Sequence, residues 1–129
     1  MGENFLIDTN IGICLMNGSL NANGLTYIEP IINADYHLSV ITKIELLGFE
    51  FKEVLYLIDT KNFVEDGIIV PLDDEIVEKT IELRRIYKIK LPDALIAATA
   101  IVFDMTLISR NDKDFTQIPE LKYVNPFTV

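Results

Sequence analysis

The sequence contains very little cysteine and histidine. Its single cysteine, Cys14, excludes an internal disulfide, and the neighbouring Leu15 and Met16 indicate a small buried side chain. The single histidine, His37, leaves no Cys/His set for zinc, and we interpret it as a core or strand-edge residue. The same scarcity removes the Ser–His and Cys–His pairs that activate protein nucleophiles.

Long apolar runs are also absent. No run reaches the roughly 18 apolar residues that a membrane-spanning helix needs. Residues 1–10 lack both the basic segment and the long apolar segment of a secretory signal, so we expect a cytoplasmic protein. Repeats, linkers and low-complexity segments are missing too, which favours one compact domain over residues 1–129.

Positive charge is scarce. There are 11 basic and 20 acidic residues, and the net charge of −9 argues against a nucleic-acid binder that relies on charge alone. Nucleic acid is not excluded, because a carboxylate cluster that binds divalent cations contributes negative charge that the metal offsets locally. Half of the residues are hydrophobic, so the chain can form a real core.

Short apolar runs alternate with helical patterns along the chain. Strands are predicted over residues 4–8, 36–40, 68–70, 106–109 and 121–124. Helices are predicted from residue 9 onward and over residues 25–33, 42–47, 51–63, 73–87 and 91–103, with a loop or single turn at 111–115. This alternation predicts an α/β protein with three layers, α/β/α, around a short parallel sheet of about five strands.

Two of these helices carry more detailed predictions. Thr42 and Glu45 stand three residues apart, as in a capping box, so Thr42 is expected to cap the helix that follows the second strand. In the helix over residues 51–63, the pattern predicts one apolar face, made of Phe51, Val54, Leu55 and Ile58.

Acidic and amide side chains follow several of the predicted strands. Asp8 ends the first strand, Glu45 lies one helical turn after the second, and Asp93 opens the apolar helix LPDALIAATA. Ligands of a doubly wound sheet bind at the carboxyl ends of its strands, so these residues are expected at one edge. After the fourth strand come three further candidates, Asn111, Asp112 and Asp114.

Each of these acids has an ordinary explanation when it is taken alone, as a helix cap, a first-turn acid or a solvated loop residue. Together they would repel one another, and no matching basic residues lie at the same strand ends. A bound cation explains the set best, and ligands that are all oxygen favour Mg²⁺ or Mn²⁺ over zinc. Burial of the helix that begins at Leu91 is expected to fix Asp93 at the rim of this pocket.

Four stretches together resemble the PIN-domain family, in particular the VapC-type toxins of prokaryotic toxin–antitoxin pairs. They are FLIDTN, SVITKIELLG, LPDALIAATA and TLISRNDKDFTQIPELKYVNPF, and their order and spacing agree over nearly the whole chain. The resemblance implies a metal-dependent endoribonuclease, in which Mg²⁺ or Mn²⁺ activates a water that hydrolyses RNA. It also implies a homodimer and a separately encoded antitoxin as partner.

The resemblance assigns roles residue by residue. Asp8, Glu45 and Asp93 match the family's three acidic positions, and Asn111 stands at a fourth, where many members have aspartate. Asp112 and Asp114 are close enough to replace Asn111 as metal ligands. The sequence leaves open which of these three residues occupies the fourth position. Next to these, Thr9 and Asn10 are expected to support Asp8, and Thr42 either lines the pocket or only caps its helix. Lys43, Arg110 and Lys113 are the candidates for RNA contact.

Other doubly wound folds with acids at strand ends fit less well. A haloacid-dehalogenase-type phosphatase needs a second aspartate where Asn10 stands, and a response-regulator receiver does not match the residues after Val70. A dinucleotide-binding domain needs a glycine-rich loop after the first strand, where only Gly12 is present. A PIN-like module that binds RNA or protein without cutting is the alternative that stays open.

Overall fold

A five-stranded parallel sheet forms the centre of the protein. The computed structural model describes residues 2–50 and 52–129. All four strand pairs are parallel, in the order β3-β2-β1-β4-β5, which confirms the α/β fold class. The strands are β1 (Asn4–Ile7), β2 (His37–Ser39), β3 (Ile68–Val70), β4 (Met105–Ile108) and β5 (Lys122–Val124).

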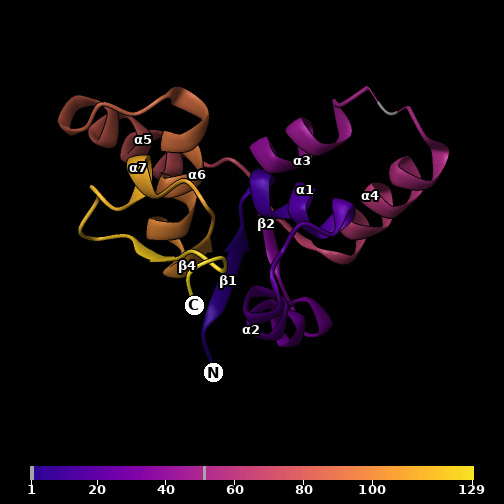
Figure 1. Ribbon diagram of the computed structural model, residues 1–129. Coiled ribbons are helices and arrows are strands. Elements are labelled where there is room, and N and C mark those ends of the chain that lie inside the picture. The colour runs from indigo at the N-terminus through magenta and orange to yellow at the C-terminus, as the bar shows by residue number, and fades with distance from the viewer. Residues whose placement is uncertain (1, 51) are drawn as a thin grey trace.

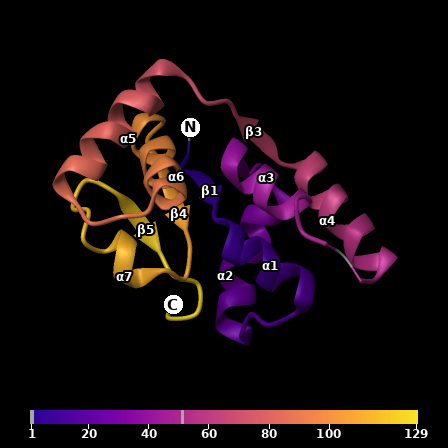
Figure 2. The same cartoon turned by 90° about the horizontal axis from the view of Figure 1, so that it is seen from above.

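Seven helices within the described residues cover the sheet on both faces (Figures 1 and 2). They alternate with the strands much as predicted, and none of them is long and apolar enough to cross a membrane. The helices are α1 (Thr9–Asn17), α2 (Ala22–Asn33), α3 (Val40–Leu47), α4 (Val54–Asp66), α5 (Asp74–Ile86), α6 (Leu91–Val102) and α7 (Asp112–Phe115).

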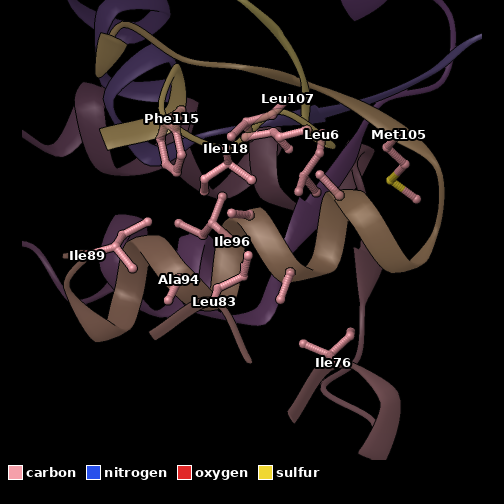
Figure 3. Close-up of a cluster of buried hydrophobic side chains, with 14 of the residues drawn as sticks. Leu6, Ile76, Leu83, Ile89, Ala94, Ile96, Met105, Leu107, Phe115 and Ile118 are labelled. Atoms are coloured by element: carbon pink, nitrogen blue, oxygen red, sulfur yellow. The ribbon is translucent and has the colours of Figure 1, made fainter. Parts of the chain in front are cut away.

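One face of the sheet packs against α5, α6 and α7, which lie together on one side of the molecule in Figure 1. Figure 3 shows Leu6 of β1 and Leu107 of β4 pointing at Ile96 of α6 and Phe115 of α7. All four alanines of α6 are fully buried, and small side chains allow the helix to approach its neighbours closely. Burial of this helix therefore fixes where its first turn, with Asp93, lies.

The other face packs against α1, α2 and α4, and α3 contributes Leu46 to the same core. Ile7 of β1 and Ile108 of β4 point to this side, because neighbouring residues of a strand face opposite ways. Cys14 of α1 is a free, buried side chain in this core, as predicted.

The register of α4 differs from the prediction. Phe51 lies outside the described residues, and α4 begins at Val54, so the predicted helix over residues 51–63 started too early. Its predicted apolar face is not buried: Val54 and Leu55 are 71% and 68% exposed, and Ile58 is exposed as well. The buried residues of α4 are instead Thr60, Phe63 and Val64.

Strand length explains why α4 leaves this face uncovered. β2 and β3 have three residues each, which corresponds to about 10 Å of strand. A helix of 13 residues is about 20 Å long, so only its second half finds a sheet to pack on. Figures 1 and 2 show the first turns of α4 reaching beyond the sheet.

Two glycines mark boundaries of these elements. Gly18 ends α1 in the left-handed conformation (φ 72°), which glycine adopts without strain. Gly67 leads from α4 into β3 with an extended backbone (φ −80°, ψ 158°). Glycine is needed there for space, because a Cβ atom would approach Tyr36 to 2.9 Å and Leu38 to 3.1 Å.

The order of the strands reverses between β1 and β4. The chain runs outward from β1 through β2 to β3, and then returns to place β4 on the opposite side of β1. The backbone N–H of Asp8 donates to Ile108 O at 2.9 Å, so the ladder continues to the last residues of both strands. The residues that follow β1 and β4 therefore meet at the switch point of the sheet, where doubly wound folds bind their ligands.

Candidate functional site

Asp8 is the most deeply buried acid at this edge. It is 4% exposed and caps α1, where its Oδ1 accepts the Thr9 N–H at 2.8 Å. Its Oδ2 accepts hydrogen bonds from Ser109 Oγ at 2.7 Å and from Asn10 Nδ2 at 3.2 Å. Burial raises the pKa of Asp8 and the charge of Glu45 adds to this, while the bonds from Ser109 and Thr9 oppose it. Asp8 thus combines an N-cap with a buried carboxylate at the switch point.

Glu45 approaches Asp8 from α3, through Thr9. The Thr9 hydroxyl donates to Glu45 Oε1 at 2.6 Å, and Thr9 Oγ1 and Thr42 Oγ1 are 3.1 Å apart. The predicted capping role of Thr42 is wrong, because Ser39 is the N-cap of α3 and its Oγ accepts the Thr42 N–H at 3.0 Å. Thr42 is fully buried, and its hydroxyl lies next to Thr9, on the side of the candidate site.

Asn10 and Ser109 join the ends of β1 and β4. Asn10 Nδ2 donates to Asp8 and also to Ser109 Oγ at 3.1 Å, while its Oδ1 accepts the Arg110 N–H at 3.3 Å. Ser109 is fully buried, and its Oγ also accepts the backbone N–H of Asn111 at 3.1 Å. Asn10 therefore contacts Asp8 as expected, and the loop after β4 is fastened to the loop after β1.

Asp93 lies in the first turn of α6 and is half-buried. Burial, hydrogen bonding with Asp114 and the charges of Asp8, Asp114 and Glu45 raise its pKa to about 7. Because these charges reach Asp93 from three other segments, the four carboxyl groups share one electrostatic neighbourhood. The structure thus brings together acids that lie as far apart in the sequence as Asp8 and Asp114.

The three polar residues after β4 separate into two groups. Asn111 Nδ2 donates to Asp114 Oδ2 at 2.9 Å and lies 3.5 Å from Asp93 Oδ2, so Asn111 and Asp114 are on the side of the acidic cluster. Asp112 is engaged elsewhere: its Oδ1 accepts hydrogen bonds from Tyr123 Oη and, at 3.1 Å, from Asn125 Nδ2. The geometry therefore favours Asn111 and Asp114 over Asp112 for the open fourth position.

The sequence of this chain matches the family model of the PIN domain over residues 5–121. The chain belongs to the PIN domain family. The resemblance found from the four sequence stretches is thereby confirmed, and the matched range includes β2, β3, β4 and all of β1 except its first residue. No curated protein sequence matches the chain.

The chain is similar to chains of several solved structures, some of which are described as toxin–antitoxin complexes. A chain of a toxin–antitoxin complex from Klebsiella pneumoniae is 33% identical, with a TM-score of 0.77 over 95% of this chain and 98% of that one. Two more share the fold at lower identity. VapBC2 from Rickettsia felis, bound to a promoter DNA fragment, is 24% identical (TM-score 0.78; 94% and 97% covered), and DNA-bound VapBC from Salmonella typhimurium is 20% identical (0.79; 97% and 99%).

Among the described residues, no lysine or arginine forms a salt bridge with the carboxylates of the candidate site. Within residues 2–50 and 52–129, the salt bridges involve only Lys79 and Lys122, both away from the site. A buried carboxylate that lacks a counter-charge is costly, and the oxygen-only donors suit a hard divalent cation. In that same part of the chain, no three Asp, Glu, His or Cys side chains stand ready to share one ion. The acids of the site would therefore have to move closer together before three of them could share one ion.

The basic residues near the site differ in how freely they can reach a ligand. Lys43 on α3 and Lys113 on α7 are exposed, each two residues or fewer from a site residue. Arg110 is also exposed, but its guanidinium lies 4.4 Å from the centre of the Phe127 ring and Nη1 donates to Cys14 Sγ at 3.6 Å. Arg110 thus packs on the C-terminal segment and is a weaker candidate for RNA contact than expected.

Sequence reasoning missed two kinds of residue at this site. Ser109 was not singled out, although it directly follows a strand, the position at which the acids were sought. Tyr123 and Asn125 were missed because their contact with Asp112 spans 11 and 13 residues and leaves no local pattern. The first could have been found by applying the strand-end rule to hydroxyl groups as well as to acids.

Proposed function

We propose that this PIN domain is a divalent-metal-dependent endoribonuclease that acts as the toxin of a toxin–antitoxin pair. The observation that carries the proposal is the meeting of Asp8, Glu45 and Asp93 at the switch point of the sheet without a cationic partner. Membership of the PIN family supports nuclease activity, and the similarity to chains of toxin–antitoxin complexes supports the toxin role.

Mg²⁺ or Mn²⁺ is the proposed metal, because every donor at the site is a hard oxygen atom. Asp8, Glu45 and Asp93 would hold it, with Asn111 and Asp114 completing the set. The chemistry supplied by a bound ion is neutralisation of charge on the scissile phosphate and activation of a water molecule at neutral pH.

The protein's own residues have positioning tasks in this proposal. Ser109, Asn10 and the Thr9 N–H fix both oxygens of Asp8, so this carboxylate reaches the site with little rotational freedom. The N-terminus of α6, with its free N–H groups, favours negative charge near Asp93. Lys43 and Lys113 flank the acids and are proposed to bind the RNA backbone.

The test is Mn²⁺-dependent cleavage of a mixed RNA pool. The wild-type protein should cut in Mn²⁺ and stop when the metal is chelated, while Asp8→Asn should cut at least about 100-fold more slowly, since removing even a supporting group of a metal site costs 10–100-fold. Asp35→Asn, an exposed acid at the opposite end of β2, is the matched control and should cut like the wild type. Equal activity of all three proteins, or none in any, would count against the enzyme.

A PIN-like module that binds without cutting is the second candidate. The observation that favours it is Asn111 at the fourth acidic position, together with the lack, among the described residues, of three acids close enough to share an ion. In that case the wild-type protein would bind RNA in a filter-binding assay but leave it intact at every Mn²⁺ concentration. Cleavage by the wild type and its loss in Asp8→Asn would exclude this candidate.

An antitoxin is the proposed protein partner. An open groove of about 440 Å³ lies beside the exposed start of α4, and its apolar lining includes Ile13 and Met16 of α1, Leu46 of α3, Tyr56 of α4, and Phe49 between α3 and α4. Exposed apolar patches of this kind mark interaction surfaces. We expect a co-expressed antitoxin from a neighbouring reading frame to co-purify with the wild type and to be lost from Leu55→Glu, while Asp35→Asn keeps it.

A homodimer in the cytoplasm completes the proposal, and it is supported by the family resemblance alone. Light scattering during size-exclusion chromatography of the isolated chain, at several concentrations, would test it. A mass of 29 kDa is expected from two copies of the 14.7 kDa chain, so about 29 kDa supports the dimer and about 15 kDa contradicts it.

A further inference from the structure

A chain of hydroxyl groups leads from the protein interior to the Glu45 carboxylate. Thr9 Oγ1 lies 2.6 Å from Glu45 Oε1 and 3.1 Å from Thr42 Oγ1, and Thr42 Oγ1 lies 3.2 Å from Ser39 Oγ. Ser39 and Thr42 are 2% and 0% exposed, whereas Glu45 lies on the surface. Side chains from β2, α3 and α1 thus connect a buried point to an exposed carboxylate.

The direction of the hydrogen bonds follows from the carboxylate end. Each hydroxyl has one proton, and an ionised carboxylate only accepts, so Thr9 donates its proton to Glu45. Thr42 must then donate to Thr9, and Ser39 must donate to Thr42. At the far end, the Ser39 oxygen accepts the Thr42 N–H at 3.0 Å, so each hydroxyl in the chain both donates and accepts.

Such an arrangement does more than satisfy buried polar groups. Hydrogen bonds aligned in one direction polarise one another, and the last one benefits most when it ends on a charge. The 2.6 Å distance between Thr9 and Glu45 is in the range of charge-assisted bonds from hydroxyl to carboxylate. An exposed glutamate without such support would exchange rapidly among its side-chain rotamers.

We propose that Ser39 and Thr42 are positioning residues for Glu45. They orient the Thr9 hydroxyl, and Thr9 holds one oxygen of the Glu45 carboxylate, which leaves the other oxygen for a ligand. The role of Ser39 is new, because helix capping alone would explain its contact with the Thr42 N–H but not its contact with the Thr42 hydroxyl. The link to cation binding rests on the proposed function.

The first test measures the Glu45 side chain in the metal-free protein. Three-bond NMR couplings should report one χ1 rotamer for Glu45 in the wild type and averaged rotamers in Thr42→Val. Thr42→Ser, which keeps the hydroxyl, should restore the single rotamer. Thr80→Val is the matched control, because Thr80 is 5% exposed and its hydroxyl donates to Ile76 O inside α5, away from the site.

The second test measures Mn²⁺ affinity by titration calorimetry. Thr42→Val should bind Mn²⁺ about tenfold more weakly than the wild type, as is typical when an outer support of a metal ligand is removed. Thr80→Val should bind like the wild type. In a Glu45→Gln background, Thr42→Val should cause no further loss, because Thr42 acts only through Glu45.

Two results would overturn the proposal. One is Thr42→Val with the Glu45 rotamer and Mn²⁺ affinity of the wild type, and the other is an equal loss in the Glu45→Gln background. If Thr42→Val does not fold, Thr9→Val breaks the last link at a partly exposed position and gives the same readouts. A wild type that binds no Mn²⁺ would contradict the proposed function, whereas the rotamer measurement would still decide about the hydroxyl chain.

Discussion

The two halves of the candidate site differ in the hydrogen-bond donors that contact their carboxyl groups. In the half formed by β1, α1 and α3, hydroxyl, amide and backbone N–H groups reach the carboxylates of Asp8 and Glu45. In the half formed by α6 and α7, the Asp93 carboxyl meets a second carboxyl, that of Asp114, and the Asn111 amide is the donor placed beside both.

The difference shows where a cation would matter most. Donors in the first half hold its carboxylates in place before any ligand arrives, which is how rigid sites are built. The second half has fewer donors, and burial together with hydrogen bonding to Asp114 and the neighbouring carboxylate charges raises the pKa of Asp93 to about 7. We therefore regard the first half as a prearranged support and the second as the part that changes most on cation binding.

The largest expected effect separates Asp93, in the first turn of α6, from Asp112, the first residue of α7. Asp93→Asn should lower Mn²⁺-dependent RNA cleavage by at least about 100-fold, because it removes a proposed metal ligand from the second half, formed by α6 and α7 and called the metal-responsive half below. Asp112→Asn should lower it by less than about tenfold, because the Asp112 carboxylate faces Tyr123 and Asn125. Initial cleavage rates of the two variants on a labelled RNA at saturating Mn²⁺ measure these effects. Similar losses in the two variants would contradict the conclusion that Asp93 belongs to the metal site and Asp112 does not.

The topology explains how much of this site could be foreseen. Alternating strands and helices predict a parallel sheet, and the strand-end rule then places Asp8, Glu45 and Asp93 together although 85 residues separate the first from the last. Predicting that these three acids lie close together requires only the order of the strands and helices, and no detailed contacts. The charges that raise the pKa of Asp93 agree with this prediction.

Details that depend on competition between equivalent groups could not be foreseen. Ser39 and Thr42 both stand where a helix cap is plausible, and only the backbone decides that Ser39 caps α3 while Thr42 turns to Thr9. Which of Asn111, Asp112 and Asp114 joins the acidic cluster could not be predicted either. Asp112 accepts hydrogen bonds from Tyr123 and Asn125 instead, and these contacts leave no local pattern in the sequence. Likewise, the exposed face of α4 follows from the shortness of β3, which the apolar pattern of the helix does not encode.

The second effect tests the support in the first half. Ser109→Ala removes the hydroxyl that donates to buried Asp8, so a carboxylate oxygen loses a short hydrogen bond inside the protein. We expect Mn²⁺ affinity to fall about tenfold and the free energy of unfolding to fall by about 1–3 kcal/mol. Calorimetry and urea denaturation measure these two quantities, with the exposed Ser19→Ala as control. A loss of stability with unchanged affinity would make Ser109 a core residue only.

The third effect is a pH dependence that belongs to the second half. The pKa of Asp93 is about 7 in the folded protein and 3.8 as its ordinary value, so the folded state binds more protons between these pH values. The free energy of unfolding of the metal-free protein should therefore fall as the pH rises from about 4 to about 7.

Melting curves can measure this dependence. The metal-free wild type should melt about 3 °C lower at pH 7.5 than at pH 5.5, a modest shift because Asp93 is only half-buried. Asp93→Asn should lose most of this difference, whereas Asp35→Asn should keep it. Saturating Mn²⁺ should stabilise the wild type more at pH 7.5 than at pH 5.5, since protonation competes with the metal. A melting temperature that rises with pH would have the wrong sign for this explanation.

The smallest effect concerns how the second half is fastened to the rest of the molecule. Tyr123 Oη lies within hydrogen-bond distance of Asp112 Oδ1 and of Ser109 O, which share its single proton, while its ring packs 5.9 Å from that of Phe115. Tyr123→Phe keeps the ring and removes this shared donor, so we expect a loss of about 1 kcal/mol in stability and less than threefold in cleavage rate. Because α7 carries Asn111 at its start and Asp114 within it, a larger fall in rate without a larger fall in stability would mean that the Tyr123–Asp112 contact positions the metal-responsive half. That result would bring Asp112 back into the functional site as a support of Asn111 and Asp114.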